Sequence, residues 1–192
     1  MKKQLFCILL VTFTVTAAYP QFTKTGGGAG FTSGYPFHEM ERDYNKSGHF
    51  FAYLKSIYEI KIPIHISPSI TFFVPHVYKE LQEKVTVNTL MVDINGHYVF
   101  NSLDKYEFYA LAGLNILHAW KRTKYQGTDP YKERDNALGL NLGAGTYIKL
   151  TEQFDLNVEA KYVLSKYSQF MLNAGVLINI DWLKKHEDTG GL

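Results

Sequence analysis

The chain has 192 residues, 15% of them aromatic, and a formal net charge of +2 at neutral pH. This length suits one domain, and the nearly balanced charge offers no basic excess that would point to a nucleic acid partner. The 14 tyrosines and 13 phenylalanines favour β structure or a membrane interface. Beyond the N-terminus, no apolar run reaches the roughly 18 residues that a transmembrane helix requires.

The N-terminal segment, residues 1–21, has the pattern of a secretory signal peptide. Lys2 and Lys3 make a positive n-region, and residues 5–18 make an apolar h-region that ends in small residues. We expect cleavage after Ala18 or a few residues later. An N-terminal membrane anchor is the alternative, and the shortness of the apolar run disfavours it.

Cleavage there would change the chemistry of the remaining chain. Cys7 is the one cysteine in the sequence and lies in the h-region, so the mature protein would have neither disulfides nor thiol chemistry. The loss of Lys2 and Lys3 from 20 basic residues leaves 18, which equals the 18 acidic residues. We therefore expect an exported, cysteine-free and neutral protein.

A glycine-rich segment opens the mature chain at residues 26–31. It is not followed by the Gly-Lys-Ser/Thr of a phosphate loop, and Phe31 stands where a dinucleotide fingerprint needs its third glycine. Glycines in a strand permit sharp curvature or leave room for bulky neighbours. The segment therefore indicates a strand of a narrow barrel.

The strand signal repeats along the chain. In residues 171–182 the even positions are all apolar and the odd positions are mostly small or polar, which is the period of a strand with two unlike faces. Comparable patterns cover eight segments: residues 22–35, 49–60, 65–74, 85–100, 106–120, 137–150, 154–164 and 171–182. An even number of strands fits an antiparallel up-and-down barrel.

Polar stretches separate these segments. We expect long exposed loops at residues 35–48, 75–84 and 121–136, alternating with short turns. The histidine and carboxylates of the first loop lack the spacing of metal ligands. No metal and no cofactor are expected.

The polar faces of the strands carry charges of both signs together with small residues. Large aromatics lie near the ends of the apolar faces, as in the interface girdles of membrane barrels. This distribution favours a barrel that is apolar outside and polar inside. The expected lumen network consists of Lys55, Glu59, Asp93, His97, Glu107, Asn141, Lys149, Asp155, Glu159, Lys161 and Asp181.

These features predict an all-β fold, an eight-stranded antiparallel up-and-down transmembrane β-barrel over residues 22–183, with a polar tail at residues 184–192. Residues 109–115, 140–145 and 154–162 resemble strands of the small outer-membrane barrels of Gram-negative bacteria, the OmpA/OmpX-like family. One departure from that family is that ten residues, 183–192, follow Trp182, because its members commonly end at the aromatic of the last strand.

The resemblance implies a non-enzymatic protein of the outer membrane with a structural or surface-interaction role. About eight strands enclose only enough room for side chains, so no wide pore is expected. The implied partners are outer-membrane lipids and lipopolysaccharide, the barrel-assembly machinery, and a surface partner that binds through the three long loops; nucleic acid is not among them.

Two alternatives remain at this stage. A lipid-modifying barrel enzyme, of the lipid A deacylase or acyltransferase type, would use His97, His118, Ser102 and Glu107, although no nucleophile motif supports it. A soluble secreted lipocalin-like barrel that binds an apolar ligand would require the apolar rows to face inward.

Overall fold

The computed structural model describes residues 22–33, 48–61, 63–80, 83–125 and 130–180. The expected signal peptide and the expected polar tail lie outside these ranges. Within them, no helix has the length and apolar character needed to cross a membrane. The strands are β1 (Phe22–Thr32), β2 (His49–Lys61), β3 (Ile64–Phe73), β4 (His76–Glu80), β5 (Glu83–Ser102), β6 (Tyr106–Tyr125), β7 (Tyr131–Lys149), β8 (Phe154–Ser165) and β9 (Gln169–Asn179).

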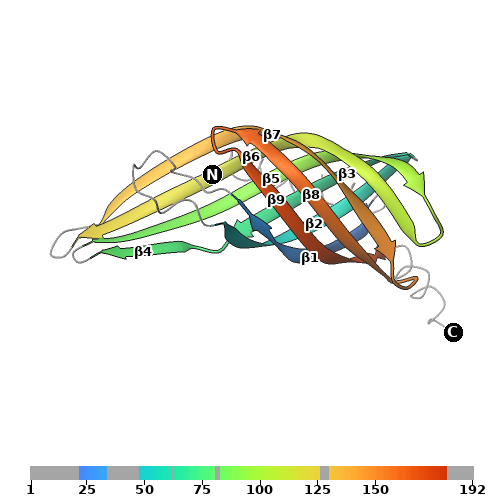
Figure 1. The fold of residues 1–192 in the computed structure, drawn as a ribbon, viewed down its shortest axis with the longest axis horizontal. Coiled ribbons are helices and arrows are strands. Elements are labelled where there is room, and N and C mark those ends of the chain that lie inside the picture. The colour runs from blue at the N-terminus through green and yellow to red at the C-terminus, as the bar shows by residue number, and fades with distance from the viewer. Residues whose placement is uncertain (1–21, 34–47, 62, 81–82, 126–129, 181–192) are drawn as a thin grey trace, which may run out of the picture.

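The strands close into a barrel (Figure 1). Consecutive strands pair antiparallel, β1 pairs with β9, and β3 pairs directly with β5, which makes a closed ring of eight strands. The short β4 pairs with the first residues of β5 and prolongs the line of β3. The predicted eight-stranded antiparallel barrel is confirmed.

Two of the expected loops are wrong. Most of residues 75–84 and 121–136 is strand, because β4 and β5 form one hairpin, while β6 and β7 continue well beyond the barrel as another. These segments bury little apolar surface, so their hydrophobic pattern is weak, and hairpin hydrogen bonds sustain the strands instead. The third expected loop, residues 35–48, lies almost entirely outside the described ranges.

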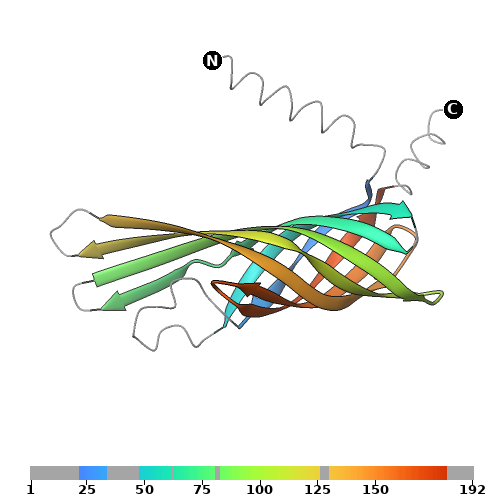
Figure 2. The same ribbon diagram turned by 90° about the horizontal axis from the view of Figure 1, so that it is seen from above.

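The prolonged strands form one sheet that we call the β-extension. It comprises β4 with residues 83–88 of β5, 118–125 of β6 and 131–136 of β7. Figure 2 shows these strand ends projecting beyond the rest of the barrel. Since β7 pairs with β8 only from Gly139 onward, the extension continues one wall of the barrel.

The apolar rows face outward. Leu138, Leu114 and Ile94 are 75%, 64% and 61% exposed, whereas polar neighbours such as Asn141 are buried. On β9 the even positions from Leu172 to Val176 are exposed and the odd positions from Met171 to Leu177 are buried, as the sequence pattern predicts. This orientation contradicts the soluble lipocalin-like alternative, which needs the apolar rows inside.

Several inward glycines make room for aromatic rings of the neighbouring strand. Gly145 lies directly opposite Tyr109, and a Cβ at Gly145 would come within 2.4 Å of the Tyr109 hydroxyl and 2.7 Å of the Val158 carbonyl oxygen. Gly30 lies opposite Phe51, and a Cβ there would lie 2.4 Å from the Phe51 ring. These contacts explain the glycines of the polar faces, because the narrow barrel has no volume for a further methyl group.

Gly145→Ala should therefore destabilise the barrel by about 1–3 kcal/mol, because overpacking forces the Tyr109 ring or the β8 backbone to move. Gly96→Ala is the matched control, since a Cβ at Gly96 has no neighbour closer than the Ala112 carbonyl oxygen at 3.6 Å. Urea unfolding of both variants in lipid vesicles measures the difference. Equal free energies of unfolding would contradict the packing argument.

Candidate functional site

The barrel interior holds a polar network at mid-height, and Glu159 of β8 is at its centre. The Lys55 ammonium lies 2.6 Å from the Glu159 carboxylate, and the Tyr109 hydroxyl donates to the same oxygen at 2.9 Å. Lys55 also donates to Asn157 at 3.2 Å, and the Asn157 amide donates to Tyr109 at 2.8 Å. The side chains of Lys55 and Glu159 are 2% and 1% exposed, so the pair is desolvated.

A second buried ion pair lies beside the first. Lys161 is 3.0 Å from Asp93, whose carboxylate also accepts hydrogen bonds from Asn141 at 2.7 Å and Ser69 at 3.1 Å. The Asn141 amide donates in addition to Asn95 at 2.7 Å. This bonding meets the requirement that a buried charge be paired and its remaining lone pairs be satisfied.

A third group of charges lies toward the end of the barrel with the short turns. Lys24 of β1 is 2.9 Å from Asp155 of β8 and 3.9 Å from Glu59 of β2. It also lies 5.3 Å from the centre of the Tyr147 ring. These contacts link β1 to its neighbour β2 and, across β9, to β8.

Apolar clusters fill the lumen on both sides of the polar layer. Toward the β-extension, the cluster consists of Phe51, Tyr53, Phe73, Met91, Leu117, Ala119, Ala137, Val163, Tyr167 and Met171. Toward the short turns, it consists of Ile57, Tyr109, Leu111, Tyr147 and Leu177. Side chains therefore pack the interior at several levels along the barrel axis.

The residues expected in the lumen are distributed as follows. Seven are buried and inward: Lys55, Asp93, His97, Asn141, Asp155, Glu159 and Lys161. Glu59 and Glu107 are partly buried, and Lys149 is exposed at the end of β7. Asp181 lies outside the described residues.

The four candidate catalytic residues do not converge. His97 is buried in the lumen, where Nδ1 lies 2.5 Å from the Tyr147 hydroxyl and the imidazole ring stacks on Tyr109 at 4.3 Å. His118 and Glu107 lie on opposite faces of β6, eleven residues apart, or roughly 36 Å along the strand. Ser102 lies opposite Glu107 and is exposed at the end of β5. No single substrate position could contact all four residues.

Sequence reasoning missed several residues of the network. Lys24 was overlooked because it precedes the glycine-rich run, although it has the inward phase of that strand. Tyr109 and Tyr147 were overlooked because an aromatic ring gives no sign of a polar role until its hydroxyl partner is known.

In the described part of the chain, no group of three His, Cys, Asp or Glu side chains is arranged to hold a metal ion.

At the mouth of the barrel, Asp135 of β7 is tied to the β8–β9 turn. Lys166 donates to its carboxylate at 2.7 Å, and the Tyr167 hydroxyl donates to the same oxygen. These hydrogen bonds lower the pKa of Asp135, with that from Lys166 contributing most. They hold the base of the β-extension against the neighbouring hairpin.

The comparisons with known proteins agree with this geometry. The model of the outer membrane protein beta-barrel domain family matches residues 5–183 of the chain. No curated protein matches the chain in sequence.

Three solved structures have a similar fold. Ail, the attachment invasion locus protein of Yersinia pestis, has a TM-score of 0.56 at 14% identity, covering 81% of this chain and 97% of its own. Neisserial surface protein A has a TM-score of 0.55 at 17% identity, covering 82% and 96%. A major outer membrane protein from Thermus thermophilus has a TM-score of 0.59 at 12% identity, covering 82% and 98%. At these identities the likeness is one of fold.

Removing one partner of the central ion pair tests its contribution to stability. Lys55→Met should lower the free energy of unfolding by about 3–5 kcal/mol, because it leaves the Glu159 carboxylate buried without its closest cation. Adding Glu159→Gln to that variant should recover part of the loss, since the unpaired charge is then gone. Unfolding in lipid vesicles measures both variants.

Lys166→Met is the matched control, because its ion pair with Asp135 is exposed to solvent. Its effect should be the smallest of the three. An effect of Lys55→Met no larger than that of Lys166→Met would contradict the importance of the buried pair.

Proposed function

Since this chain belongs to the outer membrane protein beta-barrel domain family, we propose that it is a non-enzymatic outer-membrane barrel with a closed lumen that acts through its cell-surface end. Residues 1–21 would direct its export. The observation that carries the proposal is the packed interior, in which two desolvated ion pairs lie between two apolar clusters.

The packing of the lumen argues against transport as the main activity. A path along the barrel axis would have to displace Met91, Leu117 and Met171, none of which is measurably exposed, and then break the Lys55–Glu159 pair. Eight-stranded barrels generally have interiors only wide enough for side chains. The interior therefore stabilises the barrel and is not a route for solutes.

The two ends of the barrel differ, and this difference supports the proposed orientation. Short turns join β5 to β6 and β7 to β8 at one end, whereas the β-extension projects at the other. Outer-membrane barrels place short turns in the periplasm and longer connections outside the cell. The β-extension would accordingly be the part of the protein that meets extracellular or surface partners.

Two proteins with this fold have names that describe the cell surface, namely an attachment invasion locus protein and a surface protein. These names support a surface-interaction role here. No catalytic role is proposed, because the candidate residues His97, His118, Ser102 and Glu107 do not share one site.

Planar-bilayer recording tests the closed lumen. The purified full chain should insert without the stable, large conductance steps of a general diffusion porin measured in the same bilayer, because side chains occupy the axis. Reproducible steps of porin size would contradict the proposal.

Cysteine labelling of intact cells tests the orientation. In a Cys7→Ser background, Lys124→Cys in the β-extension should react with a membrane-impermeant maleimide. Lys105→Cys, in the exposed β5–β6 turn, should react only after the outer membrane is permeabilised. The reverse pattern would overturn the assignment of the two ends.

A further inference from the structure

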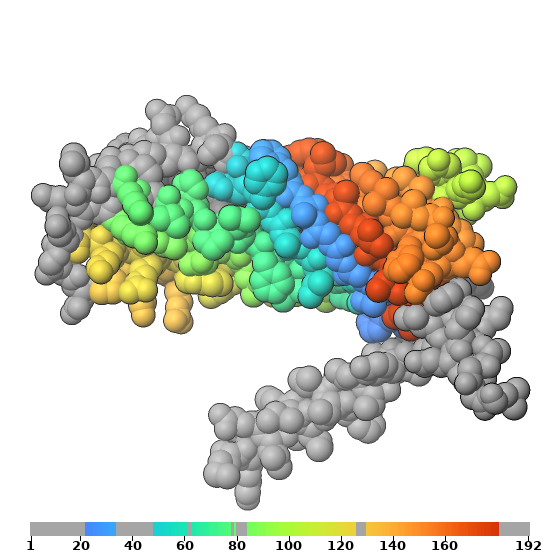
Figure 3. All heavy atoms as spheres, turned by 90° about the horizontal axis from the view of Figure 1, so that it is seen from below, coloured from blue at the N-terminus to red at the C-terminus, as the bar shows by residue number. Residues whose placement is uncertain are grey.

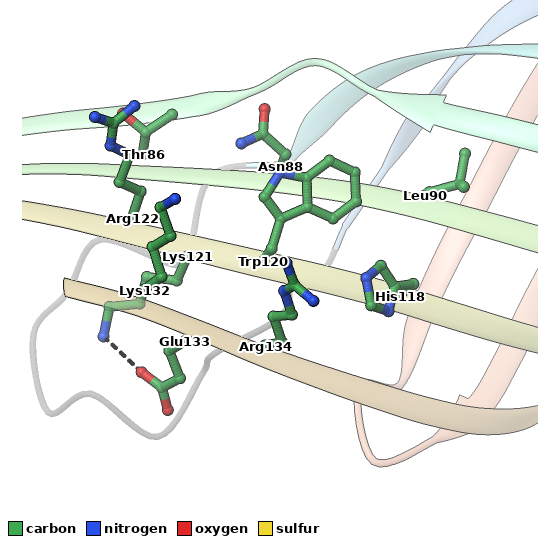
Figure 4. Close-up of a pocket in the computed structure, with 10 residues that line it drawn as sticks. All are labelled: Thr86, Asn88, Leu90, His118, Trp120, Lys121, Arg122, Lys132, Glu133 and Arg134. Carbon is green, nitrogen blue, oxygen red and sulfur yellow. Dashed lines mark hydrogen bonds and ion pairs between the residues drawn. The ribbon is translucent and has the colours of Figure 1, made fainter. Parts of the chain in front are cut away.

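We propose that the outward face of the β-extension is a binding site for the phosphate groups of a glycolipid headgroup in the outer leaflet of the membrane. The inference rests on the proposed orientation of the barrel. The site lies on the lipid side of the wall, outside the lumen, and its residues belong to β5, β6 and β7. Figure 4 shows it as a hollow lined by these strands.

Successive rows of paired residues show how the outward face changes along the wall. The row Val92, Ile116 and Leu138 is entirely apolar. The next rows toward the tip are Leu90, His118 and Asn136, then Asn88, Trp120 and Arg134, then Thr86, Arg122 and Lys132. The face thus passes from the apolar belt, through one mixed row, to a basic surface.

The distance between these rows places the cations at the level of lipid headgroups. Side chains on one face of a strand repeat every two residues, about 6.7 Å along the strand. Arg134 and Arg122 therefore lie roughly 13–20 Å along the strands beyond the last apolar row, and less along the membrane normal because barrel strands are tilted. Trp120 lies in the same row as Arg134, between the apolar belt and the row of Arg122, at a depth where interfacial tryptophans are enriched.

The charged residues that have the outward phase on these strands are all cations. Arg122 is directly opposite Lys132, and Lys84 is directly opposite Lys124. Among the side chains that the structure describes, no carboxylate lies at ion-pair distance from the cations Lys84, Arg122, Lys124, Lys132 and Arg134. Like charges placed opposite one another destabilise a sheet, so an anion bound between them would offset a cost that the fold already carries.

The acids of β7 have the opposite phase to its basic residues and pair with other cations. Glu133 lines the hollow together with Lys121, and the two lie 3.5 Å apart, whereas Asp135 binds Lys166. Because each acid already has a cation of its own, neither pairs with the outward cations. Arginine suits an external anion because its guanidinium can donate two parallel hydrogen bonds to a phosphate.

The hollow has room for a headgroup and is shaped by its own contacts. Its volume is about 690 Å³, and its lining runs from Leu90 at the apolar side to Arg122 and Lys132 at the basic side. The His118 ring bonds to Asn136 and lies 5.4 Å from the Trp120 ring. Figure 3 shows side chains of β6 and β7 standing out from the surface at this end of the molecule.

A lipid fits this site better than a soluble anion does. The basic rows continue the same outward face as the membrane belt, and Leu90 at the boundary would contact the beginning of an acyl chain. A molecule that carries both a phosphate and an acyl chain would meet both parts of the hollow. Outer-leaflet glycolipids with phosphorylated sugars have this combination.

The test uses Trp120 as the reporter. Trp120 and Trp182 are the two tryptophans of the chain, so Trp182→Phe leaves Trp120 as the single fluorophore. In zwitterionic detergent micelles, diphosphorylated lipid A should change the emission of Trp120 saturably. Lipid A stripped of its phosphates should bind at least tenfold more weakly, and added salt should weaken the binding of the phosphorylated form.

Arg122→Gln with Arg134→Gln should weaken the binding of diphosphorylated lipid A at least tenfold. Lys105→Gln with Lys149→Gln is the matched control, because it removes two exposed positive charges at the opposite end of the barrel. It should leave the affinity unchanged. Folding of each variant is checked by the shift in gel mobility on boiling, so that a failure to fold is separated from a failure to bind.

Two outcomes would overturn the proposal. One is equal affinity for the phosphorylated and the stripped lipid, or no effect of the Arg122 and Arg134 changes in a folded variant. The other is binding of inorganic triphosphate as tight as that of the lipid, which would make the ligand a soluble anion. Neither result would change the bilayer recordings or the cysteine labelling. Those two experiments test the proposed function on their own, so a failure of the lipid site can be told apart from a failure of the proposed function.

Discussion

Hydrocarbon offers no hydrogen-bond partner to a peptide group, and so a sheet in a bilayer must have no free edge. The pairing of β1 with β9 meets this constraint, and the rest of the barrel depends on it. The seam is close: a Cβ at Gly28 would lie 2.1 Å from the Ala174 carbonyl oxygen. Glycine permits that close approach of the two backbones. Lys24 strengthens the seam through its ion pair with Asp155, which spans from β1 to β8 across β9.

Closure with eight strands then determines how wide the lumen is and how its charged side chains must be paired. The lumen is too narrow for bulk water to solvate charges freely, so each charged side chain needs a partner of opposite sign from another wall of the barrel. Lys55 of β2 reaches Glu159 of β8, and Lys161 of β8 reaches Asp93 of β5. These pairs cross-link strands that are not neighbours in the sheet. Both pairs therefore cross the interior of the barrel.

The sequence was sufficient to predict the features that depend on the two-residue period of a strand, namely the strands themselves and the face of each that points inward. Alternation identified the eight strands, and the mixed charges of the polar faces indicated the inward side, as Asn141 and Glu159 illustrate. Phase alone could not separate buried from exposed positions at strand ends, where Lys149 is open to solvent. Nor could it detect strands that lack an apolar face, so residues 75–84 and 121–136 were interpreted as loops although hairpin pairing makes most of them strand.

That last difference bears on the basic surface. In a loop, Arg122, Lys132 and Arg134 would move apart and their repulsion would be dispersed in water. On paired strands their spacing is set by the register, with Arg122 opposite Lys132 and Trp120 opposite Arg134. A sheet that holds like charges together beside an apolar belt is under electrostatic stress that an anionic neighbour would relieve. In an outer membrane, the phosphates nearest to such a face would be those of the surrounding lipid, and the proposed site would bind them because the extension continues the outward face of the barrel wall.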